Sequence, residues 1–175
     1  NPAAKYQMLA FTNMAHEGLI VLATHRLVAN LDGFDIKKLI AGLGRNFRVT
    51  ARAFDDEASK ADAKGKMLAR MKAETDKGRS AFAIYGGVGA FYLAALKDGG
   101  AMDSAVPERS AAYRALDVAV LHKLILEELL GIDEQCRAKG ENLEYVKGTP
   151  NAIDDSIARV DAGEKQAAFF MNPIK

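Results

Sequence analysis

Two histidines and one arginine combine reactive side chains with apolar surroundings in this sequence. His25 and Arg26 interrupt an apolar run near the start, and His122 interrupts a leucine-rich run in the second half of the sequence. Imidazole titrates near neutral pH and can pass protons. A guanidinium presents a planar fork that fits carboxylate or phosphate. These residues therefore predict acid–base chemistry at His25 and His122, and anion binding at Arg26.

Each of these residues also has a structural interpretation. Either histidine is also explained as a hydrogen-bonded core residue, and Arg26 as the partner of a carboxylate such as Asp117. Asp117 is a further candidate for the anion site, although a carboxylate in the first turn of a helix also favours the helix dipole. Asn172 either caps the last strand or lines the pocket. No residue spacing indicates a metal site, and none identifies a cofactor.

The helix that carries His122 is predicted over residues 116–130. At roughly 100° per residue, its apolar side chains share one wide arc, with His122 near the middle and Asp117 about 140° away. Gly131 follows as a C-terminal cap. We therefore expect His122 to be buried with a hydrogen-bond partner, and to approach His25 if this helix covers the His25 face of the sheet.

The strand that carries His25 and Arg26 is predicted over residues 19–29. Alternate side chains are apolar on both faces, which predicts a central strand with His25 on one face and Arg26 on the other. A strand over residues 6–14 would pair with it as a hairpin. Residues 80–85 and 90–96 predict a second hairpin around the glycine-rich turn, and residues 166–171 predict a final strand.

The other segments predict helices and strands that cover this sheet. We expect an amphipathic helix after an Asp35 cap, a strand over 48–54, a surface helix within 55–77 with Ala61, Leu68 and Met71 inward, and a loop over 99–110. A short helical segment at 134–140, a strand at 143–146 and a helix capped at Thr149 follow. This order predicts one α+β domain over residues 1–175, with a mixed, largely antiparallel sheet and packed helices.

The composition excludes some partners. The chain has 175 residues, with 24 Lys and Arg against 23 Asp and Glu. This near-neutral balance disfavours nucleic acid and anionic membranes as partners. No apolar stretch approaches the roughly 20 residues that span a bilayer. The single Cys136 excludes an internal disulfide and fits a cytoplasmic location.

Four segments together resemble one known family. They are LATHRLV at 22–28, PERS at 107–110, LDVAVLH at 116–122 and QAAFFMNP at 166–173, with Asn13 and Met14 in addition. In this order they resemble the C-terminal half of the prokaryotic family called domain of unknown function 1015. Longer members of that family carry an upstream half similar to ParB-like and sulfiredoxin-like proteins, some of which are small-molecule kinases. The resemblance therefore implies that this chain is an excised C-terminal part whose partner is its own N-terminal half.

These observations predict a cytoplasmic domain that forms one wall of a small-molecule or nucleotide/phosphate site, completed by that N-terminal half. Arg26, with Asp117 or Asn172 beside it, would contact an anion, and His25 or His122 would assist. Whether the domain is an enzyme stays open. One alternative is a regulatory or nucleic-acid-associated module similar to ParB, which the near-neutral charge disfavours. Another is a structural domain that forms a homodimer or docks the missing half.

Overall fold

The computed structural model describes residues 11, 13 and 21–173. The predicted strand at 6–14, and its hairpin with 19–29, therefore lie largely outside the described residues. Phe11 and Asn13 are described, and neither belongs to a strand.

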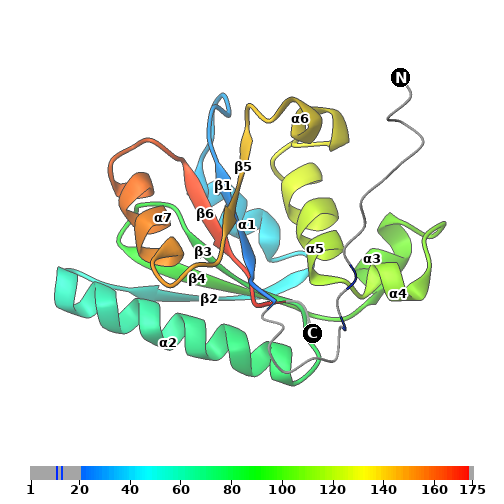
Figure 1. The fold of residues 1–175 in the computed structure, drawn as a ribbon, viewed down its shortest axis with the longest axis horizontal. Coiled ribbons are helices and arrows are strands. Elements are labelled where there is room, and N and C mark those ends of the chain that lie inside the picture. The colour runs from blue at the N-terminus through cyan, green and yellow to red at the C-terminus, as the bar shows by residue number, and fades with distance from the viewer. Residues whose placement is uncertain (1–10, 12, 14–20, 174–175) are drawn as a thin grey trace.

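Within the described residues, six antiparallel strands form one sheet, in the order β2-β4-β3-β6-β1-β5 (Figure 1). The strand that carries His25 and Arg26 lies between β6 and β5, so it is an interior strand, as its two apolar faces predict. The six strands are β1 (Thr24–Val28), β2 (Phe47–Ala53), β3 (Ala81–Tyr85), β4 (Ala90–Leu96), β5 (Leu143–Lys147) and β6 (Ala167–Phe170).

Helices cover both faces of this sheet (Figure 1). On one face α1, α3, α5 and a π-helix (η2) form a core with Val28 of β1, and on the other α2 and α7 form a core with Leu27. The described helices are α1 (Ile36–Leu43), α2 (Glu57–Asp76), α3 (Gly100–Ala105), α4 (Ala111–Arg114), α5 (Asp117–Val120), η2 (Leu121–Glu127), α6 (Glu134–Lys139) and α7 (Ala152–Asp161). The α+β architecture is thus confirmed.

Local signals place several of these elements. The Asp35 carboxylate accepts the backbone N–H of Lys37 at 2.8 Å and caps α1, as predicted. The turn between β3 and β4 holds Gly87 and Gly89 at φ 72° and 66°, where a side chain would be strained. The hairpin interpretation of this glycine-rich turn is therefore confirmed.

Some expectations were wrong in detail. Segment 99–110 contains helix α3 rather than only a loop. The buried stripe of α2 consists of Ala63, Met67 and Met71, while Ala61 is exposed. Helix α7 begins after Asn151 rather than after Thr149.

The predicted helix 116–130 is α-helical only over α5. It continues as η2, a π-helix in which a backbone N–H bonds to the carbonyl five residues earlier instead of four. The Glu128 N–H, for example, bonds to the Lys123 carbonyl at 3.2 Å.

Across the described part of the chain, no helix has the length and apolar character that crossing a bilayer requires.

Candidate functional site

The sheet separates the two neighbouring candidates on β1. His25 lies on the face covered by α2 and α7, where its ring packs edge-on to Phe170 with centroids 5.4 Å apart. Arg26 lies on the opposite face and reaches His122 of η2. Because η2 covers the Arg26 face, the two histidines do not meet, and two separate groups of candidates result.

His25 is a buried, neutral imidazole with a fixed tautomer. The residue is 3% exposed, and its Nδ1 accepts the backbone N–H of Met171 at 3.3 Å. The pKa of His25 is lowered by burial and, secondarily, by the charge of Arg26. With Nδ1 as the acceptor, the hydrogen of the neutral ring is on Nε2, which has no partner among the described residues.

A cavity of about 530 Å³ lies beside His25. Asn172 also lines this His25 cavity, and its Nδ2 donates to the Thr75 hydroxyl at 2.7 Å and to the Met71 carbonyl at 3.3 Å. These two bonds fix the amide and leave Oδ1 as an acceptor. The cavity lining consists of Val21, Leu22, Ala23, His25, Leu68, Ala69, Met71, Lys72, Gly148, Thr149, Ile153, Met171, Asn172 and Pro173.

This lining has the character of a small-molecule site. Most of its side chains are apolar, and a few polar groups, among them His25 and Asn172, are available for specific hydrogen bonds. Lys72 adds a cation whose side chain is 72% exposed and pairs with Asp76 at 2.9 Å. The cavity can therefore hold a carbon skeleton against its walls and a polar group against His25.

The second group of candidates surrounds Arg26. This residue is 5% exposed, and its Nε donates to Nε2 of His122 at 3.3 Å. Nη1 donates to the Thr24 carbonyl at 2.5 Å, and the Tyr145 ring lies 4.4 Å from the guanidinium carbon. The Tyr145 contact is a cation–π interaction across the β1–β5 pair, where the two residues are in register.

His122 is half-buried rather than fully buried, and it has a hydrogen-bond partner as predicted, which is Arg26. Since Nε2 accepts from Arg26, the neutral ring carries its hydrogen on Nδ1. Burial, followed by the charges of Arg26 and Arg137, lowers the pKa of His122 to about 4. The ring lies on a π-helical segment, a geometry that is frequent at functional sites.

Asp117 belongs to neither group. It begins α5 and lines a separate cavity of about 220 Å³, together with Arg79, Ser80 and Pro173. It forms no ion pair with Arg26, so the structural interpretation of an Arg26–Asp117 bridge was wrong. Asn172 is likewise on the His25 side of the sheet rather than beside Arg26.

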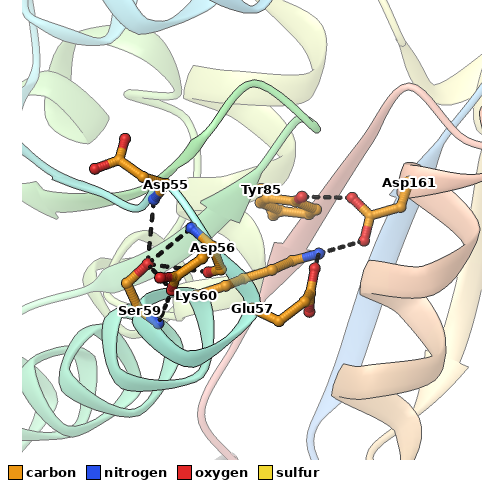
Figure 2. A network of polar contacts seen from close by, with 7 residues as sticks. All are labelled: Asp55, Asp56, Glu57, Ser59, Lys60, Tyr85 and Asp161. Atoms are coloured by element: carbon orange, nitrogen blue, oxygen red, sulfur yellow. Dashed lines mark hydrogen bonds and ion pairs between the residues drawn. The ribbon is translucent and has the colours of Figure 1, made fainter.

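Sequence reasoning missed one polar network, which joins α2 to α7 (Figure 2). Asp161 accepts from Lys60 Nζ at 2.6 Å and from the Tyr85 hydroxyl at 2.5 Å. Burial and then this hydrogen bond raise the pKa of Tyr85 to about 12. The spacing of Lys60 to the buried Ala63 and Met67 was the available signal, because it places Lys60 on the inner face of α2. The charges of Lys60 and Asp161 neutralise each other, so this network ties the layers together.

Comparison with known proteins gives a family. Residues 1–119 match the model of a family described as protein of unknown function (DUF1015). The matched part contains β1 with His25 and Arg26, and ends within α5. No curated protein and no solved structure shows significant similarity to the chain. Because the match covers more than half of the 175 residues, this chain belongs to the DUF1015 family.

Proposed function

We propose that this domain binds a small organic molecule in the His25 cavity and forms one wall of a site that an upstream half of the protein completes. The observation that carries the proposal is the buried neutral imidazole of His25, whose Nε2–H has no partner among the described residues and which lines a cavity of about 530 Å³. The resemblance to longer family members supports the role of an upstream half.

The polar groups of the cavity favour one class of ligand. His25 offers an N–H donor and Asn172 an amide oxygen acceptor, while Lys72 places positive charge nearby. A molecule with a carboxylate or carbonyl oxygen and an N–H or O–H group would use all three. Leu68, Met71 and Ile153 would contact its carbon skeleton.

The same geometry favours a binding role for His25. A neutral imidazole has one lone pair, and Nδ1 already uses it to accept the Met171 N–H. Proton abstraction by His25 would first require this hydrogen bond to break. We therefore propose that His25 orients the ligand through Nε2–H, and acid–base catalysis by this residue stays a prediction.

A ligand-stabilisation screen tests the proposal. The full-length protein is heated with amino acids, short organic acids and nucleotides, and the ligands that raise the Tm are titrated by calorimetry. His25→Asn keeps an acceptor near the Nδ1 position and removes Nε2–H, so affinity should fall about tenfold, as one lost hydrogen bond predicts. Arg52→Lys, an exposed position on the edge strand β2 and outside both groups of candidates, is the control and should keep the wild-type affinity. A screen without a stabilising ligand, or equal affinities for both variants, would refute the proposal.

A further inference from the structure

We propose a second site on the opposite face of the sheet, where Arg26, His122 and Arg137 bind an oxyanion of phosphate or carboxylate type beside the Tyr145 ring. This site is separate from the His25 cavity and does not depend on the function proposed above. It is built by three elements: β1, η2 and α6.

The first argument is that the buried charge of Arg26 meets no carboxylate among the described residues. The residue is 5% exposed, and none of the described carboxylates lies within ion-pair distance of it. Its Nη2 has no partner among these residues either, while every fully buried side-chain nitrogen and oxygen does have one. Nη2 therefore stays in contact with solvent. A buried cation without an anion is costly, and an incoming oxyanion at Nη2 would remove that cost.

The second argument is the positive character of the surroundings of His122. Arg137 belongs to α6, whose Cys136 packs against the same core as the leucines of η2, and its charge, like that of Arg26, lowers the pKa of this imidazole. Arg137 is half-buried, and its Nη1 donates to the Ile132 carbonyl at 3.5 Å. The Asp133 carboxylate accepts the Cys136 N–H at 2.8 Å, which lowers its pKa, and the charge of Arg137 adds to this effect. Asp133 and Arg137 nevertheless form no ion pair.

The third argument is the orientation of the donors. His122 uses its lone pair to accept from Arg26, so it presents Nδ1–H as a second donor, without a partner in the described part of the chain. Tyr145 covers one face of the Arg26 guanidinium and holds its plane in place. A fixed guanidinium edge and an imidazole N–H are donors that suit phosphate and carboxylate oxygens.

The test uses inorganic phosphate and acetate as probes on the full chain, at matched ionic strength with chloride. Binding is followed by calorimetry and by the NMR resonances of the His122 ring. We expect saturable binding that shifts these resonances, with phosphate alone indicating a phosphorylated ligand and acetate alone a carboxylate. Absence of saturable binding for both probes would overturn the proposal.

Three variants locate the binding. Arg26→Lys keeps the positive charge but loses the planar pair of guanidinium donors. Arg137→Gln removes the second cation. Each variant should weaken anion binding about tenfold or more. Arg52→Lys changes an exposed arginine of β2, at the opposite edge of the sheet, and should leave affinity unchanged. If Arg26→Lys does not fold, the half-buried Arg137→Gln decides. Equal affinities for Arg137→Gln and Arg52→Lys would place the anion elsewhere and refute the site.

Discussion

The two histidines use their basic nitrogens as hydrogen-bond acceptors within the protein, so neither ring is a free base. Each neutral ring uses its only lone pair within the protein: His25 accepts from Met171 N–H, and His122 accepts from Arg26 Nε. Burial lowers both pKa values, so both rings are neutral near pH about 7. The outward N–H groups at Nε2 of His25 and Nδ1 of His122 are what a ligand would meet on each face.

The lowered pKa of His122 predicts acid sensitivity. Its pKa is about 4 in the folded state and 6.5 in the unfolded chain, so between these values the unfolded state binds more protons. Stability should therefore fall as pH decreases from 6.5 towards about 4. Urea denaturation across this pH range measures the effect. His122→Asn should flatten the slope, and an unchanged slope would contradict the assigned environment.

At more acidic pH, the stability of the fold depends on a different residue, Glu144. Glu144 accepts two hydrogen bonds from Arg159 at 2.7 and 2.8 Å. These bonds, and a further one from Lys165, lower the pKa of Glu144 from 4.5 to about 2. Its contribution is present above pH 4.5 and is lost as pH falls towards about 2. The slope between pH 6.5 and 4.5 therefore reports on the histidines, separately from Glu144.

The Tyr85 hydroxyl provides a second prediction for a single residue. Tyr85 is 2% exposed and donates to Asp161, which also pairs with Lys60 (Figure 2). Tyr85→Phe should lower the free energy of unfolding by about 1–3 kcal/mol, because a part-buried hydrogen bond to a charged group is lost. Tyr92→Phe is the matched control, since the half-buried Tyr92 of β4 has no hydroxyl partner among the described residues. Equal denaturation midpoints for the two variants would show that the network adds no stability.

Among the elements, strand alternation gave the most reliable information. The strict two-residue period of β1 placed His25 and Arg26 on opposite faces, and its apolar character on both faces indicated an interior strand. The sequence could not show which face the helix over 116–130 covers. That choice depends on packing between layers, and it decides that His122 meets Arg26 rather than His25.

The π-helix could not be predicted from periodicity. Its leucines keep the spacing of an ordinary amphipathic helix, and the wider turn is visible only in the backbone hydrogen bonds of residues such as Glu128. The same limit applies to the Lys60–Asp161 pair, whose members are 101 positions apart. Contacts between residues so far apart in the sequence depend on the topology, and no local sequence pattern indicates them.

The cap of α1 gives a prediction at the level of an element. Asp35 accepts the N–H groups of Lys37 and Lys38 at the start of this helix. Asp35→Ala should destabilise the protein by about 1 kcal/mol, because the capped donors lose their acceptor. Asp32→Ala changes an exposed loop carboxylate three residues earlier and should leave the denaturation midpoint unchanged. A similar loss in both variants would indicate a general charge effect instead of capping.

For the whole molecule, the sheet divides the two proposed sites. The His25 cavity opens on the face of α2 and α7, and the oxyanion site lies on the face of η2 and α6. Both begin from adjacent residues of β1, the strand that lies within the part matching the DUF1015 family. Because the side chains point to opposite faces, a variant on one side should leave ligand binding on the other side intact.

The rim of the His25 cavity allows a test of how an upstream half would sit on this domain. Val21 and Leu22 line the cavity and are 44% and 48% exposed, so two adjacent large apolar side chains meet solvent at its rim. If an upstream half completes the site, it should cover these residues. In a Cys136→Ser background, Leu22→Cys should react with a maleimide at least about tenfold more slowly in the full-length protein than in the domain alone.

Val88→Cys is the control, because Val88 is 47% exposed at the β3–β4 turn and should react equally in both. Equal rates at Leu22→Cys would show that the cavity stays open, and the upstream half would then have no part in the site.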